Sequence, residues 1–151
     1  MVKVSIGCTV YNHEKYLRDA LDGFIKQKTS FDYEVIVHDD ASTDSSAEII
    51  REYASKYPNI VKPIYQKENQ YSKGILITNT YVIPAMQGEY LAHCEGDDYW
   101  TDENKLQKQV DFLDAHQEYC ACMHNVIKRD MWHETCTEMY HWGADRDLTI
   151  A

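Results

Sequence analysis

Two predicted β-strands of this chain each run straight into a cluster of carboxylates, and this pattern limits the possible folds more than any other feature. The β-like run 33–37 precedes the acidic segment 38–44, and the apolar residues 90–92 precede segment 93–100, where three carboxylates fall within four residues. Carboxylates this crowded repel one another, so a cation usually holds them together. For either cluster alone, an acidic turn that faces water is the alternative. Two such strand ends at one edge of an open α/β sheet would form a ligand site, because ligands bind at the carboxyl ends of the strands.

Strand-like and helix-like patterns alternate along the chain. Period-two patterns and apolar runs bounded by polar residues predict strands over 2–9, 33–38, 60–66, 89–94 and 119–127. Apolar residues at helical spacing predict helices after a capping Asn12, at the capping-box residues 45–48, near Thr101 and, more weakly, over 76–87. The alternation predicts an α/β fold with a mostly parallel sheet flanked by helices on both faces.

The composition fits one such domain and excludes several functions. A chain of 151 residues with 44% hydrophobic residues can bury a substantial core. Its formal charge of −10 opposes binding to nucleic acid or to an anionic membrane surface. No run approaches the about 18 apolar residues of a membrane span, and the N-terminus reads as a strand and not as an export signal. We therefore expect a cytoplasmic protein with no nucleic-acid partner and no integral membrane segment.

The five cysteines, an odd number without an export signal, indicate free thiols in a reducing compartment. Cys120, Cys122 and His124 alternate along the predicted strand 119–127, so their side chains would point to one face. A structural zinc site is one interpretation of this pattern together with the later residues His133, Cys136 and His141. Paired CxxC knuckles are missing, and free cysteine is commonly a small core residue, so we predict no zinc site.

Three blocks of sequence carry a resemblance to a known family. They are residues 9–17 (Thr-Val-Tyr-Asn-His-Glu-Lys-Tyr-Leu), residues 39–44 (Asp-Asp-Ala-Ser-Thr-Asp) and residues 88–100, which include Glu-Gly-Asp-Asp at 95–98. In this order and at these separations they strongly resemble family 2 of the glycosyltransferases, which use nucleotide-sugar donors and have the GT-A fold. The resemblance runs from Val2 to about Asn125 and implies a Rossmann-like GT-A sheet that the chain leaves incomplete after the fifth strand.

The resemblance implies a nucleotide site on the first two strands. Thr9 and Tyr11 would lie beside a uracil-like base, and the Tyr11 ring would offer a face for stacking. Asp39 would accept a hydrogen bond from the base N–H. The structural alternatives are that Tyr11 packs against its own helix, and that Asp39 or Asp40 caps the following turn.

The resemblance also implies a metal-binding motif, with Glu95 in the first position of the family's usual Asp-any-Asp. Asp97 and Asp98 are both eligible as direct ligands of Mg²⁺ or Mn²⁺, and we favour Asp97, with Glu95 near the ribose. Together with phosphate oxygens, these carboxylates would hold an ion that neutralises the diphosphate leaving group. Gly96 would let the backbone approach the sugar nucleotide closely.

Aromatic and basic residues beside these motifs are more typical of structure than of ligand binding. Tyr99 and Trp100 could line the donor pocket, but large aromatic residues at a strand end usually belong to the core. Lys73 could reach the diphosphate, but a lone lysine is usually solvated. We therefore expect none of them among the site residues.

These inferences predict an enzyme that transfers a hexose-type sugar from a UDP-like donor to an acceptor hydroxyl, with inversion, in surface polysaccharide or lipid-linked glycan synthesis. Residues 1–127 would form the nucleotide-sugar-binding core, and residues 128–151 the start of an incomplete acceptor-side region. The chain looks like the donor-binding half of a longer enzyme, whose missing segments would place it peripherally at the inner face of the membrane. The general base is expected beyond Ala151, because no family motif matches the nearby carboxylates Glu134, Glu138, Asp145 and Asp147.

Two other classes of function compete with this interpretation. A catalytically incomplete module would bind a nucleotide-sugar or a partner protein without chemistry. A phosphatase or phosphoacceptor domain fits less well, because such proteins need a nucleophilic Asp at the end of the first strand. This chain has Cys-Thr-Val-Tyr there, at residues 8–11.

Overall fold

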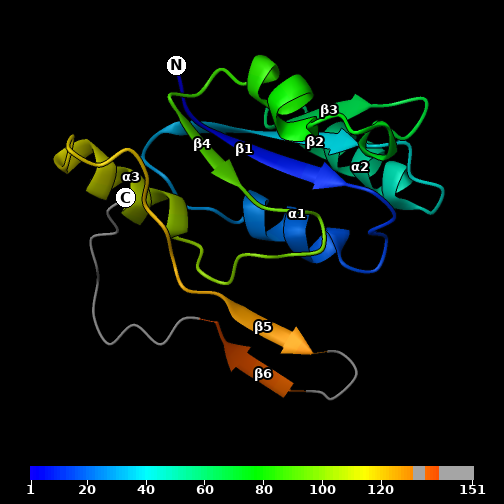
Figure 1. Ribbon diagram of the computed structural model, residues 1–151. Helices are drawn as coiled ribbons and strands as arrows, with labels where there is room; N and C mark the ends of the chain where they lie inside the picture. Colours follow the sequence, from blue (N-terminus) through cyan, green and yellow to red (C-terminus); the bar gives the residue numbers. More distant parts are fainter. Residues whose placement is uncertain (131–134, 140–151) are drawn as a thin grey trace. The chain divides into compact units, whose positions relative to one another are not determined.

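The computed structural model describes residues 1–130 and 135–139 of the chain. Two units, Met1–Asp111 and Phe112–Ala151, each make most of their contacts internally. The first contains a four-stranded sheet and the second a two-stranded sheet (Figure 1). Within the described residues, no helix has both the length and the apolar character that a membrane crossing requires.

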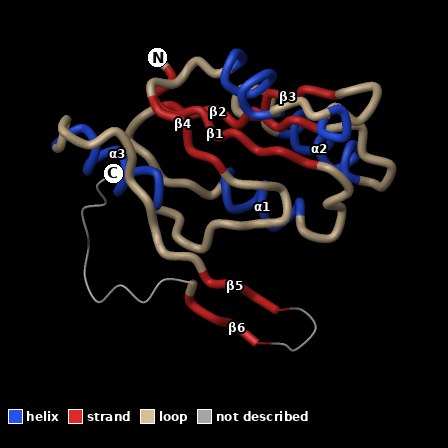
Figure 2. The backbone as a smooth tube through the Cα atoms, viewed as in Figure 1, coloured by secondary structure: helices blue, strands red, loops and turns tan. Residues whose placement is uncertain are grey.

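The four strands predicted between residues 2 and 94 form one parallel sheet. They are β1 (Val2–Val10), β2 (Asp32–Asp39), β3 (Val61–Tyr65) and β4 (Tyr90–His93), in the spatial order β3-β2-β1-β4 (Figures 1 and 2). β1 is an interior strand with a parallel partner on each side. Its carboxyl end therefore lies between the chain segments that leave β2 and β4. The predicted α/β class and these four strands are confirmed.

The two faces of this sheet are covered by different kinds of helix. One face packs into an apolar core with α1 (Leu17–Ile25), α2 (Ser46–Lys56) and α3 (Lys105–Ala115), and β1 contributes every second residue to that core: Val4, Ile6, Cys8 and Val10. The other face lies against the π-helical turn η2 (Thr78–Val82), which the 3₁₀ turn η3 (Ile83–Ala85) follows directly. Figure 1 shows α1 on one side of β1 and the green turns on the other. Helical segments thus flank both faces, as predicted.

The helices depart from the sequence patterns at three places, in where they start, how they are capped or whether they are continuous. α1 begins at Leu17 and not after Asn12, which has a φ of 58° and accepts a hydrogen bond from another loop. α2 begins as predicted, but its capping box is not formed: the Ser45 side chain makes no cap bond, and Ser45 N donates to Glu14 Oε2 at 2.9 Å and not to Glu48. The helix predicted over 76–87 is broken into η2 and η3, since Pro84 has no backbone N–H to donate.

The fifth predicted strand is wrong in both position and pairing. Residues 119–126 form no strand, and β5 (Ile127–Asp130) pairs antiparallel with β6 (Thr135–Glu138) in a separate sheet. The alternating residues at 119–127 predicted a strand with one buried face. Side chains of this segment such as Cys120 and Met123 are exposed, so no such face is buried and the pattern does not lead to a strand. The units divide between Asp111 and Phe112, whereas the boundary predicted between 127 and 128 concerns function and stays a proposal.

A buried carboxylate fixes the start of β4 against β1 and β2. Glu34 is only 3% exposed, and its Oε1 accepts hydrogen bonds from Ser5 Oγ at 2.7 Å and from Gln87 N at 2.8 Å. Gly88 N donates to Ser5 Oγ at 2.9 Å. A Cβ atom on Gly88 would lie 2.5 Å from Ser5 N, closer than side chains approach backbone. Only glycine therefore lets the chain enter β4 along this path.

We expect Gly88→Ala to lower the free energy of unfolding by roughly 1–3 kcal/mol, because the added methyl group overlaps the backbone of β1. Gly74→Ala is the matched control: Gly74 has a φ of 78°, but open space surrounds its missing Cβ. That variant should lose only about 1 kcal/mol, the cost of a left-handed alanine. Denaturant unfolding of both variants measures the difference, and equal losses would contradict the close packing at Gly88.

Candidate functional site

The strand register brings the two acidic segments to the same end of β1. Val10 pairs with Asp39 of β2, and Asp40 N donates to Val10 O at 2.9 Å. On the other side Gly7 pairs with His93 of β4, and beyond the strand Gly96 N donates to Thr9 O at 3.0 Å. The prediction that both clusters reach one edge of the sheet is confirmed. The individual roles of their residues stay predictions.

Asp39 and Asp40 are both buried, but their hydrogen bonding differs. The carboxylate of Asp40 accepts Gln70 N at 2.8 Å on Oδ1 and Tyr71 N at 2.9 Å on Oδ2, so it holds the start of η1 (Tyr71–Lys73). Asp39 Oδ1 is buried and has no hydrogen-bond partner within the described part of the chain. An unpaired buried polar group costs on the order of 1–3 kcal/mol, and more when it is charged. Asp40 therefore has a structural role, although it holds the segment after β3 and does not cap the turn that follows β2, whereas Asp39 keeps an oxygen without a partner among the described residues.

The turn after β1, residues 11–14, is tied to the turn after β2, residues 42–46. Asn12 Oδ1 accepts Thr43 N at 2.8 Å, and Glu14 N donates to Asp44 Oδ2 at 3.0 Å. Further bonds run from Asn12 N to Ser42 Oγ, from His13 N to Ser46 Oγ and from Ser45 N to Glu14 Oε2. Both segments use left-handed backbone, with φ values of 58° at Asn12 and 62° at Ala41. We call this set of bonds the loop clasp; it fixes the edge of the sheet where the acidic segments meet.

Thr9 and Tyr11 lie at the end of β1 and in the turn that follows. Thr9 is half-buried, and its carbonyl oxygen accepts the hydrogen bond from the acidic turn. The Tyr11 side chain is 45% exposed, so it is not packed away against the following helix. Its ring remains accessible for stacking at the edge where the carboxylates converge.

The acidic turn 95–98 presents its carboxylates to solvent above a buried glycine. Glu95, Asp97 and Asp98 are exposed, and Asp98 N closes the turn by donating to Glu95 O at 3.2 Å. A Cβ atom on Gly96 would lie 2.9 Å from Val10 Cγ2 and 2.9 Å from the imidazole of His13. The glycine is therefore required by packing beneath the turn.

This turn fits the way proteins hold Mg²⁺ or Mn²⁺ beside a phosphate ligand. In residues 1–130 and 135–139, no group of three or more His, Cys, Asp or Glu side chains is arranged to hold an ion. Ions of this kind are commonly bound by only one or two carboxylates, with phosphate oxygens and water as the other ligands. Exposed carboxylates at Asp97 and Asp98 match that mode of binding.

Two histidines at this edge were not singled out by the sequence analysis. His13 Nδ1 is buried, has no hydrogen-bond partner in the described part of the chain, and lies 3.8 Å from Asp97 Oδ1. His38, fully buried on β2, stacks on Tyr81 with ring centroids 5.0 Å apart, and its Nε2 lies 3.1 Å from Gln66 Nε2. Desolvation lowers the pKa of His38, and the neighbouring charges of Asp40 and Asp39 only partly offset it. For His38, the available signal was its position directly after the buried apolar run 35–37.

The cysteines of the first unit do not act as nucleophiles at this edge. Cys8 and Cys94 are buried, and desolvation raises the pKa of both thiols, that of Cys94 to about 12. They stay protonated at neutral pH. Among the residues considered for zinc, Cys120 and Cys136 are exposed, while His133 and His141 lie outside the described residues.

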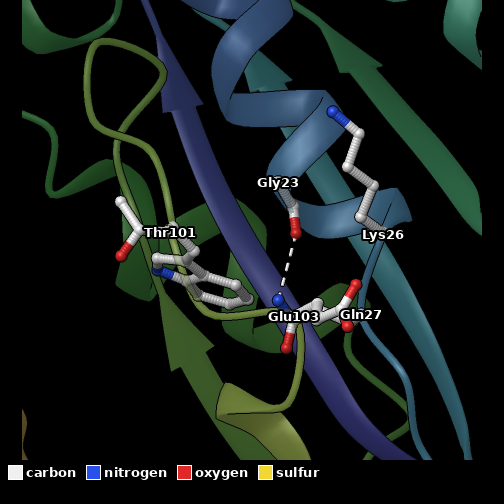
Figure 3. A pocket seen from close by; sticks show the side chains of 6 residues that line it. Gly23, Lys26, Gln27, Thr101 and Glu103 are labelled. Atoms are coloured by element: carbon white, nitrogen blue, oxygen red, sulfur yellow. Dashed lines mark hydrogen bonds between the residues drawn. The ribbon is translucent and has the colours of Figure 1, made fainter.

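A pocket of about 180 Å³ lies at the carboxyl end of α1, and none of the predicted site residues lines it (Figure 3). Trp100, one of its walls, packs edge-to-face on Phe24 with ring centroids 4.9 Å apart. Gln27 is buried there and joins Gly23 O and Asp102 O through its Nε2. Trp100 is therefore a core residue, as predicted. Tyr99 differs, because it is 53% exposed.

The parallel sheet, flanked by helices and with polar residues gathered at the carboxyl ends of its strands, places this chain in the class of open α/β proteins that bind ligands at that edge. The chain belongs to glycosyl transferase family 2, whose family model matches residues 5–141. An uncharacterized protein of Mycobacterium tuberculosis is 51% identical over 123 residues, which cover 82% of this chain and 35% of that protein. A poly(ribitol-phosphate) beta-glucosyltransferase of Bacillus spizizenii is 36% identical over 70% of this chain and 16% of its own length. The chain thus spans about a third or less of these relatives.

Solved structures agree with the family and with the GT-A fold. The crystal structure of S. aureus TarS 1-349 in complex with UDP superposes with a TM-score of 0.65 and 29% identity. The superposition covers 77% of this chain and 33% of the TarS chain. The expected family and fold are therefore confirmed.

The burial of His38 should make the stability of the fold pH-dependent. Because its folded pKa lies below the ordinary value, the unfolded chain binds the extra proton first as the pH falls through about 6.5. Stability should then decrease by up to about 1.4 kcal/mol per pH unit until the folded pKa is reached. His38→Phe keeps the stacking on Tyr81 and removes this slope. Denaturant unfolding at pH 7.5 and 5.5 measures this loss of unfolding free energy, with His116→Gln as a control at an exposed histidine. If wild type and His38→Phe lose the same free energy between the two pH values, His38 is not the cause of the pH dependence.

Proposed function

We propose that this protein transfers a sugar from a nucleotide-sugar donor, in the first place a UDP-sugar, to an acceptor hydroxyl in surface polysaccharide or glycan synthesis. The observation that carries the proposal is the convergence of Asp39 and the 95–98 turn on the end of β1. Membership of glycosyl transferase family 2 supports it. So do the names of similar proteins, a beta-glucosyltransferase and TarS in complexes with UDP and UDP-GlcNAc.

The nucleotide would lie over the end of β1. The Tyr11 ring, exposed in the turn, would stack on the base, and Thr9 would line the site beneath it. Asp39 would accept the base N–H through its unpaired Oδ1, a charge-assisted hydrogen bond. Glu95, at the start of the acidic turn, would face the ribose. The loop clasp would keep these groups in place before the donor binds, so that less ordering is required on binding.

Asp97, with Asp98 as the second candidate, would hold a divalent cation together with the donor's phosphates. When bound, Mg²⁺ or Mn²⁺ neutralises the charge that develops on the departing diphosphate. Attack by the acceptor oxygen from the opposite side of the sugar ring would give inversion. Glu138 lies exposed on β6 and matches no family motif, and the other three carboxylates considered lie outside the described residues. A general base beyond Ala151 stays a prediction.

Asp97→Ala should weaken Mn²⁺-dependent UDP binding by about tenfold or more, because a direct ligand of the ion is lost. Titration calorimetry with UDP and Mn²⁺ measures this on wild type, Asp97→Ala and Asp98→Ala, and the larger loss identifies the direct ligand. Asp32→Ala removes the same charge from the start of β2, at the opposite edge of the sheet, and should bind as wild type does. Equal affinity in all four proteins would remove the proposed metal role.

The substitutions Asp39→Asn and Asp40→Asn should have different effects, the first on UDP binding and the second on the stability of the fold. Replacing Asp39 should weaken UDP binding by roughly 10- to 100-fold, the worth of a hydrogen bond to a charged group. It should not lower the melting temperature, because Oδ1 has no partner among the residues that the structure describes. Asp40→Asn should instead destabilise the fold by about 1–3 kcal/mol, since its oxygens accept two backbone N–H groups. A fall in melting temperature for Asp39→Asn as large as for Asp40→Asn would argue for a purely structural Asp39.

A further inference from the structure

We propose that His13 is a positioning residue for Asp97: its Nδ1–H donates a hydrogen bond to the Asp97 carboxylate when that carboxylate binds the cation. The inference rests on the proposed function and adds to it a residue with no contact to donor or ion. It explains a buried nitrogen that has no partner among the described residues. It also explains why an imidazole packs directly beneath the acidic turn.

The backbone of His13 is fixed from two directions. His13 N donates to Ser46 Oγ at 2.9 Å, which is part of the loop clasp. His13 O accepts Tyr16 N at 3.0 Å and Leu17 N at 2.9 Å, at the start of α1. The side chain is 22% exposed, and its Nδ1 atom is buried. The main chain of His13 is thus held by bonds that do not involve the acidic turn, and the imidazole packs beneath Gly96.

The acidic turn has one fixed and one adjustable part. Gly96 N is bonded to Thr9 O at 3.0 Å, and the missing Cβ of Gly96 would lie 2.9 Å from His13 Nδ1. The Asp97 side chain is 46% exposed, so its carboxylate can turn without disturbing the core. The present separation of 3.8 Å between Nδ1 and Oδ1 is too long for a hydrogen bond. A movement of about 1 Å brings the two atoms to the distance of a charge-assisted bond.

Two considerations favour a supporting role over direct coordination. The Nδ1 atom lies beneath Gly96, whereas the Asp97 side chain is 46% exposed, so an ion that keeps its phosphate and water ligands meets Asp97 first. Carboxylates that bind metals commonly accept a hydrogen bond from an outer residue, and that bond fixes their orientation. A donor placed behind Asp97 leaves the exposed oxygen of the carboxylate for the ion.

The test compares two substitutions that keep different nitrogens. His13→Asn places an amide nitrogen near the position of Nδ1, whereas His13→Gln places one near Nε2. Mn²⁺ affinity at saturating UDP, measured by electron paramagnetic resonance, should fall about tenfold in His13→Gln, the usual loss when an outer partner is removed. His13→Asn should bind Mn²⁺ nearly as wild type does, and so should the control His116→Gln. UDP affinity without Mn²⁺ and the melting temperature should be the same in both His13 variants.

A measurement on the wild type removes any dependence on how the variants fold. Histidine ¹⁵N NMR should show a protonated Nδ1 on His13 and, on addition of UDP and Mg²⁺, a downfield, slowly exchanging proton at that nitrogen. An unprotonated Nδ1 in the bound state, equal Mn²⁺ affinity of His13→Asn and His13→Gln, or a direct ¹⁴N coupling to Mn²⁺ would each overturn the role of His13. If the proposed function itself is wrong, the result is different: wild type and Asp97→Ala would then bind Mn²⁺ and UDP with equal affinity.

Discussion

Two backbone hydrogen bonds at the end of β1 hold the candidate site together. Asp40 N reaches Val10 O from one neighbouring segment, and Gly96 N reaches Thr9 O from the other. Both are possible because β1 is an interior strand with parallel partners, so the segments leaving β2 and β4 pass on either side of its carboxyl end. Carboxylates that are 50 to 60 residues apart in the sequence thereby come to one edge of the sheet.

The turn 11–14 forms a second layer of support for the same edge. Asn12 and Glu14 bond to the turn after β2, and His13 packs beneath the acidic turn after β4. The neighbouring carboxylates on β2 divide their tasks in a similar way, since Asp40 holds backbone while Asp39 keeps an oxygen unpaired. Rigid surroundings around a few unsatisfied polar atoms are what a preorganised binding site requires.

Burial explains which sequence patterns were reliable. The four strands of the first unit were predicted correctly because their apolar residues face a core, as those of β1 do. The alternation at 119–127 had no such face, and no strand forms over 119–126. The start of α1 was harder to place, because the side chain of Asn12 bonds to Thr43 in another loop and does not cap the helix. Local propensity cannot anticipate a partner from a distant turn.

The sequence by itself determined the α/β class, the four parallel strands, the family and the positions of the two acidic segments, because these follow from periodicity and from short motifs. Only the tertiary structure decided that Asp40 holds backbone while Asp39 keeps an unpaired oxygen, that His13 lies beneath the acidic turn, and that His38 is buried on β2. Those distinctions depend on hydrogen-bond partners and on burial, both of which are set by contacts between segments far apart in the chain. A motif fixes which chemical groups are present, and packing fixes which of them remain free to bind.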